Sequence, residues 1–421
     1  MIKIICSAQA YTYNAYHIVK AFYPSVEITN HVEEKASNYV EITFCDGRVI
    51  AVEKEEIKAG TDAEKKAQVD KKLYEKLSEK SGKTLAWGIL TGVRPTKLAM
   101  KKLEEGMEAE EFVSWFQKTY LVSEEKSRLA WEIAKREKQL LDQLDYEDGY
   151  SLYVGIPFCP TVCTYCSFSS GALEDWKDFV DDYVEALCKE LEFIGKVSKQ
   201  KKLNSIYIGG GTPTSLNARQ LERILSCIDT HFSREYLLEY TVEAGRPDSI
   251  TEEKLQVIKA HKVTRISINP QTMQQKTLDI IGRKHTVEDI CKTYEMARNL
   301  GLDNINMDLI AGLPGETSVD MKDTLEKVGR LQPDSLTVHS LAIKRAAKMG
   351  QEVKEGQSDA SMCNISPEIG AMIREAEKAA DDMGLKPYYL YRQKNIAGNF
   401  ENVGYAKVDK AGIYNILIME E

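Results

Sequence analysis

The sequence lacks the features that mark membrane-spanning, exported and nucleic-acid-binding proteins. No apolar run approaches the roughly 20 residues that a spanning helix needs. The N-terminal stretch MIKIICSAQAYTYNAYHIVK has no basic segment, no continuous apolar run and no cleavage site. It therefore does not resemble a signal peptide. Positive charge is in deficit, and a net charge of −9 argues against a polyanionic partner. These absences predict a cytoplasmic protein with no membrane span and no nucleic-acid partner.

Cysteine is sparse and unevenly placed. Nine cysteines, an odd number in a chain without a signal peptide, do not suggest a disulfide scaffold. Six stand singly, whereas Cys159, Cys163 and Cys166 form the pattern C-x3-C-x2-C. No second C-x2-C is present, so a zinc site with four ligands is not indicated. Three cysteines instead leave one iron of a [4Fe–4S] cluster without a protein ligand and open to another molecule.

The order of apolar and polar residues divides the chain into three domains. Residues 1–147 have an α+β pattern, with a hairpin predicted around Asp46-Gly47, a charged helix that ends at Gly82, and a helix that begins at Pro95. Residues 346–421 form a C-terminal elaboration, with a helix over 367–384 and a last strand, IYNILIM. The abrupt end after Glu421 is compatible with a truncated chain.

Residues 148–345 alternate regularly between short apolar runs and helical patterns. Six strands separated by helices predict βαβ units and a parallel sheet, and six are too few to close an eight-stranded barrel. We therefore expect a partial (β/α)6 barrel. The six predicted strands are LYVGI (152–156), SIYIG (205–209), LEYTVE (238–243), TRISI (264–268), INMDLI (305–310) and SLTVHSL (335–341).

Each predicted strand ends in a polar or glycine-rich segment. The carboxyl ends of parallel strands lie at one edge of a barrel, so these segments should form a single site. Their repeated placement is stronger evidence for one active site than any single motif. In chain order they are the cysteine segment, GGGTPT (209–214), Glu243, Asn269-Pro270-Gln271, Asp308, and His339 with Ser340.

The segment GIPFCPTVCTYC, with Tyr165 before the last cysteine, resembles the signature of the radical SAM superfamily. The resemblance implies a radical SAM fold with a [4Fe–4S] cluster held by Cys159, Cys163 and Cys166. It also implies that S-adenosyl-L-methionine binds the open iron and is cleaved reductively to a 5′-deoxyadenosyl radical. An electron donor such as flavodoxin or ferredoxin is implied as a partner.

Further motifs resemble the oxygen-independent coproporphyrinogen III oxidase group, in its HemZ-like branch. They are YVGIPFC, IYIGGGTPT, VEAGRPDSI, RISINPQT, INMDLIAGLPGET, LYRQKNIAGNFENVGY and the earlier GILTGVRPTKL. By the same motifs, the resemblance implies that the S-adenosylmethionine contacts are Tyr153, Tyr165, Gly210, Gly211, Thr212, Glu243, Gln271, Arg283, Asp308 and Ala342.

Two differences from the oxidases bear on the reaction. Phe168 stands where the oxidases place a fourth cysteine, and their N-terminal segment is not recognisable in residues 1–145. A tetrapyrrole with several propionates also needs fixed cations, which charge-assisted hydrogen bonds could supply. The candidates for this role are Lys344, Arg345, Arg392 and Lys394.

The expected function is a radical SAM oxidoreductase that acts on a tetrapyrrole. The expected reaction is the oxygen-independent oxidative decarboxylation of coproporphyrinogen III to protoporphyrinogen IX. One alternative is a radical SAM enzyme that modifies haem or opens its ring. A second alternative, from a different class, is a haem-binding or haem-delivery protein related to the haem chaperones.

Overall fold

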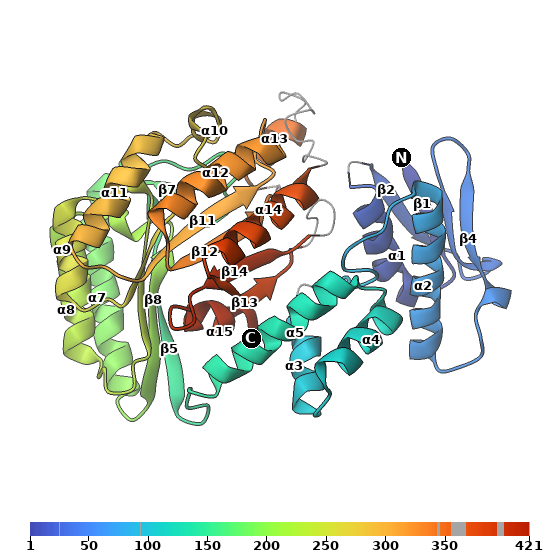
Figure 1. Ribbon diagram of the computed structural model, residues 1–421, viewed down its shortest axis with the longest axis horizontal. Coiled ribbons are helices and arrows are strands. Elements are labelled where there is room, and N and C mark those ends of the chain that lie inside the picture. Colours follow the sequence, from blue (N-terminus) through green and yellow to red (C-terminus); the bar gives the residue numbers. More distant parts are fainter. Residues whose placement is uncertain (25, 93, 343–345, 355–367, 394–399, 421) are drawn as a thin grey trace. The chain divides into compact units, whose positions relative to one another are not determined.

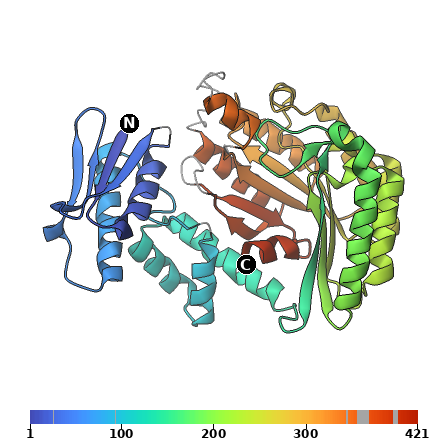
Figure 2. The same ribbon diagram turned by 180° about the vertical axis from the view of Figure 1, so that it is seen from behind.

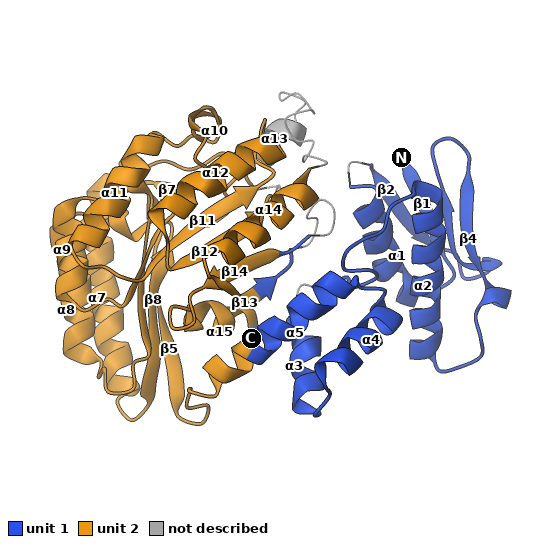
Figure 3. Ribbon diagram, in the orientation of Figure 1, with its two compact units in different colours: residues 1–135, 390–401 blue, residues 136–389, 402–421 orange. Residues whose placement is uncertain are grey.

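The computed structural model describes residues 1–24, 26–92, 94–342, 346–354, 368–393 and 400–420. These residues form two compact units, which Figure 3 shows in different colours. Unit 1 comprises residues 1–135 and 390–401, and unit 2 comprises residues 136–389 and 402–421. The division falls inside one helix, α5 (Glu124–Leu141), rather than in the acidic turn near residue 147.

Unit 1 begins with a four-stranded sheet in the order β2-β1-β3-β4. The predicted hairpin forms β3 and β4, and Gly47 adopts the left-handed conformation (φ 79°) that its turn requires. The predicted charged helix is α2, which ends at a left-handed Gly82. The bounds in this part are β1 (Ile2–Cys6), α1 (Gln9–Phe22), β2 (Ile28–Val32), β3 (Asn38–Thr43), β4 (Val49–Glu53) and α2 (Asp62–Ser81).

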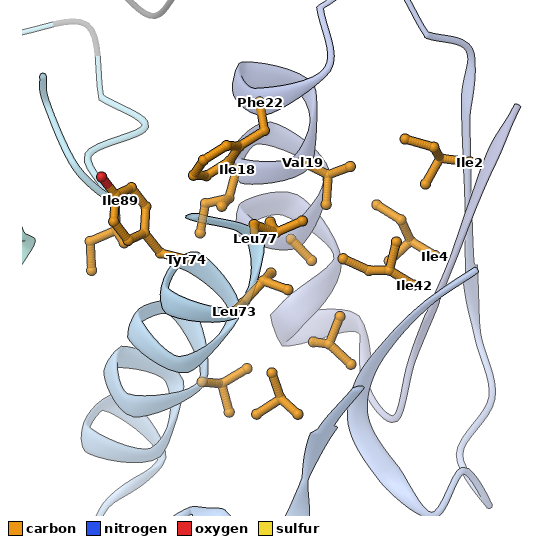
Figure 4. Packing of buried hydrophobic residues seen from close by; sticks show 14 of the residues in the cluster. Ile2, Ile4, Ile18, Val19, Phe22, Ile42, Leu73, Tyr74, Leu77 and Ile89 are labelled. Carbon is orange, nitrogen blue, oxygen red and sulfur yellow. The ribbon is translucent and has the colours of Figure 1, made fainter. Parts of the chain in front are cut away.

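The core of unit 1 lies between this sheet and the helices α1 and α2. Figure 4 shows Ile4 and Ile42 of the sheet close to Val19 of α1 and Leu77 of α2. All four side chains are fully buried. Burial of each side chain stabilises the fold by about 1.5–3 kcal/mol relative to exposure, so these contacts help to hold the sheet and the helices together.

Three helices and a returning segment complete unit 1. The helices are α3 (Thr96–Glu104), which follows Pro95 as predicted, α4 (Ala109–Tyr120) and the first part of α5. The indole Nε1 of the buried Trp87 donates to Glu401 Oε2 over 2.7 Å. Lys126 Nζ lies 2.8 Å from Glu401 Oε1, and both side chains are buried. This polar cluster attaches residues 390–401 to a unit formed mostly by the first third of the chain.

Unit 2 contains a curled eight-stranded sheet in the order β13-β14-β12-β11-β10-β9-β8-β5 (Figure 1). The six predicted strands form its parallel part, and neighbouring strands pair in parallel from β5 through to β12. The predicted partial (β/α)6 barrel is therefore confirmed. The bounds are β5 (Gly149–Ile156), β8 (Lys202–Gly210), β9 (Glu239–Gly245), β10 (Arg265–Ile268), β11 (Ile305–Ala311) and β12 (Ser335–Ser340).

The helices between these strands lie on the outer side of the sheet (Figures 1 and 2). Neighbouring helices α7 and α8, and α8 and α9, pack against one another. Almost every residue of β8, β9 and β10 is buried, so these strands are buried on both faces, which explains why they read as largely apolar runs. The bounds are α6 (Leu173–Trp176), α7 (Val180–Val197), α8 (Ala218–His231), α9 (Glu252–Ala260), α10 (Gln275–Ile280), α11 (Val287–Asn299), α12 (Ser318–Leu331) and α13 (Lys348–Lys354).

The C-terminal part extends the sheet instead of forming a separate body. Strand β14 (Asn402–Ala406) pairs antiparallel with β12, and β13 (Lys386–Tyr391) lies beside it. The predicted helix over 367–384 is α14 (Ile369–Asp382), which packs against α12. The prediction of a last strand at IYNILIM is wrong, because these residues form the helix α15 (Ile413–Glu420). Glu239, at the start of β9, accepts hydrogen bonds from the first N–H groups of this helix.

Candidate functional site

The three clustered cysteines lie in the loop that follows β5. The short strands β6 (Phe158–Cys159) and β7 (Gly171–Ala172) pair with each other and close this loop at its base. Within it, the Cys166 N–H donates to the Cys163 carbonyl over 3.1 Å. Cys163 is buried, whereas Cys159 and Cys166 are partly exposed, and all three are free thiols.

Each of the three sulfurs accepts at least one hydrogen bond. Thr212 Oγ1 donates to Cys159 Sγ over 3.4 Å, and Arg246 Nη1 donates to Cys163 Sγ over 3.8 Å. The backbone N–H of Phe168 donates to Cys166 and stabilises its thiolate form. Burial still raises the pKa of the Cys166 thiol, and the nearby Cys163 and Cys159 add to this effect. A bound metal would remove this cost, because a coordinating thiol is deprotonated.

The cysteine loop fits a cluster better than a single ion. Among the residues that the structure describes, no three His, Cys, Asp or Glu side chains lie close enough together to hold one metal ion. In a [4Fe–4S] cluster each cysteine binds a different iron, so the sulfurs stay further apart than around one ion. Phe168 is 74% exposed, and its phenyl ring has no donor atom that could serve as a fourth ligand. The residues present therefore fit a cluster with three protein ligands.

The glycine segment after β8 lies directly against the cysteine loop. A Cβ atom on Gly211 would lie 2.7 Å from Phe158 O and 3.0 Å from Cys159 Sγ, so no other residue fits here without a shift. Gly210 is left-handed (φ 109°) and similarly close to Ile156. The N–H groups of Gly211 and Thr212 donate to Ile156 O and Phe158 O. These glycines allow close packing between two strand ends.

Polar side chains from the next strands meet inside the barrel. Glu243 of β9 accepts a hydrogen bond from the Tyr207 hydroxyl, and Asp308 of β11 accepts one from Asn306 over 2.7 Å. Gln271, in the left-handed conformation (φ 67°), exchanges backbone hydrogen bonds with the strand that carries Asp308. Asp308 also raises the pKa of Glu243 by charge repulsion, so the carboxyl groups of β9 and β11 lie near each other.

Arg283 connects the cysteine loop to the end of β10. Its guanidinium donates hydrogen bonds to Asn269 O and, over 3.4 Å, to the Tyr165 hydroxyl. It also interacts with the Cys163 thiol through a hydrogen bond and through its charge. Arg283 is only 6% exposed, and its Nε has no hydrogen-bond partner in the part of the chain that the structure describes. A buried charged donor without a partner is costly, so this nitrogen is suited to an anionic ligand such as a carboxylate.

The remaining expected cofactor contacts are Tyr153 and Ala342. They lie at opposite edges of the six parallel strands, Tyr153 on β5 and Ala342 just after β12. Tyr153 of β5 is 48% exposed, and its ring stacks 6.2 Å from Tyr207 and 6.0 Å from Tyr414. Ala342 follows β12 and is half-buried. Tyr207 itself was not selected from the sequence, although its place in the run IYIGGGTPT could have indicated it.

Of the four expected substrate cations, Arg392 alone lies among the residues that the structure describes. Lys344, Arg345 and Lys394 lie outside the described residues. Arg392 belongs to unit 1, is only 5% exposed, and donates from Nη1 to Leu90 O over 2.8 Å and to Gly92 O over 3.2 Å. Burial lowers the pKa of its guanidinium to about 10, against the opposite effect of Glu401.

The environment of Glu243 leads to a prediction about pH and stability. Burial raises the pKa of Glu243 from 4.5 to about 7, although the hydrogen bond from Tyr207 opposes the rise. Between these values the folded chain keeps a proton that the unfolded chain releases, so this group's contribution to stability falls as pH rises. Glu243→Gln does not titrate, so we expect it to gain about 3 kcal/mol relative to the wild type from pH 4.5 to 7.5.

Urea unfolding of the cofactor-free chain at the two pH values measures this gain. The exposed Glu235→Gln is the matched control, because it makes the same chemical change outside the barrel. Equal pH dependence in Glu243→Gln and the wild type would contradict the prediction.

Comparison with known proteins places this site in a family. The model of the radical SAM superfamily matches residues 153–328. The chain is 44% identical over 349 residues to the oxygen-independent coproporphyrinogen-III oxidase-like protein HemZ of Bacillus subtilis, covering 82% of this chain and 69% of HemZ. It is 37% identical over 197 residues to the heme chaperone HemW of the same organism, covering 46% of this chain and 51% of HemW.

A solved structure supports the same relationship. Coproporphyrinogen III oxidase (HemN) from Escherichia coli, described as a radical SAM enzyme, superposes with a TM-score of 0.53 at 25% identity. The alignment covers 64% of this chain and 58% of HemN.

The chain therefore belongs to the radical SAM superfamily and, within it, to the group of HemN, HemW and the HemZ-like proteins. Membership confirms the expected cofactors, a [4Fe–4S] cluster and S-adenosyl-L-methionine. It also supports an enzyme with a role related to tetrapyrroles. None of the described helices is long and apolar enough to cross a membrane.

Proposed function

We propose that the chain catalyses the oxygen-independent oxidative decarboxylation of coproporphyrinogen III to protoporphyrinogen IX. The observation that carries the proposal is the 44% identity to HemZ, which extends over 349 residues and beyond the barrel. The similarity to HemN in fold adds support, since HemN is named as a coproporphyrinogen III oxidase. A flavodoxin or a ferredoxin is the proposed electron donor.

The residues at the strand ends are proposed to hold the two cofactors. Cys159, Cys163 and Cys166 bind the cluster, which together with S-adenosylmethionine supplies a radical that abstracts hydrogen from substrate. The chain's own groups orient the cofactor: carboxylates accept from hydroxyl and amino groups, and the guanidinium of Arg283 donates to a carboxylate. The proposed S-adenosylmethionine contacts are Tyr153, Tyr165, Gly210, Gly211, Thr212, Glu243, Gln271, Arg283, Asp308 and Ala342.

The substrate propionates require cations, and Lys344, Arg345 and Lys394 are proposed for this role. Arg392 fits the role less well, because its Nη1 already donates to the carbonyls of Leu90 and Gly92. Its burial favours a structural function within unit 1.

A second candidate function is haem binding or haem delivery. The 37% identity to the heme chaperone HemW over 197 residues favours it, and that match covers about half of each chain. Phe168 in place of the oxidases' extra cysteine is compatible with this candidate.

Anaerobic product analysis with coproporphyrinogen III and haem as competing substrates tests the proposal. We expect protoporphyrinogen IX and 5′-deoxyadenosine to accumulate together, because hydrogen abstraction from the propionate side chain consumes the cofactor. Consumption of haem with cofactor cleavage would instead identify a haem-modifying or ring-opening enzyme. Stable haem binding without any 5′-deoxyadenosine would contradict both enzyme functions and favour the carrier.

A further inference from the structure

Arg246 directly follows β9 and reaches the cysteine loop with one edge of its guanidinium. It is 3% exposed, and its Nη1 donates to Thr161 O over 2.6 Å and to Thr161 Oγ1 over 2.9 Å. The same nitrogen lies 3.8 Å from Cys163 Sγ. A buried positive charge thus contacts one of the three proposed cluster ligands.

Asp248 holds the other edge of this guanidinium. Arg246 Nε and Nη2 donate to its two carboxylate oxygens over 3.0 and 2.6 Å, a two-pronged pairing that fixes the plane of the group. His285 Nδ1 lies 3.5 Å from the same carboxylate. Although burial opposes it, hydrogen bonds from His285 and Arg246 keep the pKa of Asp248 well below its usual value. The pair is therefore a fixed positive charge with a fixed counter-charge behind it.

We propose that Arg246 is a positioning residue that sets the reduction potential of the cluster through Cys163, with Asp248 moderating its charge. Reduction adds an electron to the cluster, so a hydrogen-bonded positive charge at a ligand sulfur stabilises the reduced form. Hydrogen bonds to cluster sulfurs are one of the means by which proteins tune these potentials. This proposal depends on the cluster and not on the tetrapyrrole. Failure of the proposed oxidase activity would therefore not contradict it.

A purely structural role for Arg246 makes different predictions. The hydrogen bonds from Arg246 to Thr161 also hold the cysteine loop in place. If this were the only role, a substitution of either Arg246 or Asp248 would loosen the loop and reduce iron binding. Tuning by charge instead makes two substitutions act in opposite directions. Loss of the positive charge in Arg246→Gln disfavours reduction, whereas loss of the negative charge in Asp248→Asn favours it.

The experiment is a redox titration of the anaerobically reconstituted full chain, monitored by electron paramagnetic resonance without any tetrapyrrole. For Arg246→Gln we expect about a tenfold lower ratio of reduced to oxidised cluster at fixed potential, which is ~59 mV for one electron. For Asp248→Asn we expect this ratio to rise severalfold. Arg298→Gln is the matched control, because Arg298 pairs with Asp334 at the other end of the strands and should leave the potential unchanged.

Iron content and the melting temperature of the cluster-free chain are measured in parallel. An unchanged or raised potential in Arg246→Gln would overturn the proposal. If Arg246→Gln takes up no iron, Asp248→Asn decides: a raised potential supports charge tuning, and an unchanged or lowered one overturns it. Equal loss of iron and of melting temperature in both variants, with no opposed shifts in potential, would establish a purely structural role.

Discussion

Replacing Cys163 by alanine is expected to abolish cluster binding and with it the cleavage of S-adenosylmethionine. Cys163 is the most deeply buried of the three clustered cysteines and accepts a hydrogen bond from Arg246. With two ligands left, the cluster has two irons without a protein ligand and is not retained. We expect iron to fall from about four per chain to well below one, and 5′-deoxyadenosine to become undetectable. Iron and sulfide analysis after anaerobic reconstitution, with chromatography of the products, measures both.

Cys227→Ala is the matched control for this prediction. Cys227 lies on α8, partly exposed, where its thiol donates to the Cys188 carbonyl over 3.4 Å. Its removal makes the same chemical change at a site away from the strand ends, so iron and cleavage should stay at the wild-type level. Full iron content in Cys163→Ala would refute the assignment of the cysteine loop as the cluster site.

The barrel could be predicted because its strands carry a strong local signal. A strand buried on both faces is apolar throughout, and β8, with the run SIYIGG, is an example. The helices between the strands have regular apolar spacing, so the alternation is visible over the whole segment. The two added strands β13 and β14 were not predicted, because they belong to a less regular part of the chain.

The candidate site was predictable where residues lie at strand ends. Glu243, Gln271 and Asp308 meet because parallel strands end at one edge, a consequence of topology that sequence order already contains. Arg246 was missed because the segment GRPD reads as an ordinary turn, and its contact with Cys163 depends on two loops far apart in sequence. For the same reason, the pattern YRQKN does not reveal that Arg392 is buried.

The helix α15 shows where local pattern was misleading. IYNILIM is rich in β-branched and aromatic residues, which favour strands. Short apolar runs of this kind are ambiguous, and tertiary contacts decide their structure. Here Glu239, far away in sequence, accepts hydrogen bonds from the N–H groups of Ile413 and Tyr414, which would otherwise lack partners at the start of the helix.

Glu239→Ala is accordingly expected to cause a large loss of stability. Glu239 is 4% exposed and also accepts from Thr241 Oγ1 over 2.8 Å. The positive charge of Arg265, which is 3% exposed, stabilises the ionised form of the same carboxylate. Removal of the Glu239 carboxylate takes away one counter-charge of the buried Arg265 guanidinium and leaves two helix N–H groups without an acceptor. Such losses cost about 3–5 kcal/mol, measurable as a lower urea midpoint of the cofactor-free chain.

We expect the buried charge of Arg265 to contribute as much to this loss of stability as the lost hydrogen bonds do. We therefore expect the double variant Glu239→Ala/Arg265→Met to be more stable than Glu239→Ala alone, since the buried guanidinium that lost the Glu239 carboxylate is then absent as well. Exposed Glu235→Ala, from the loop before β9, is the control and should change stability by less than about 0.5 kcal/mol. A double variant no more stable than Glu239→Ala would show that the helix start, and not the buried charge, accounts for the loss.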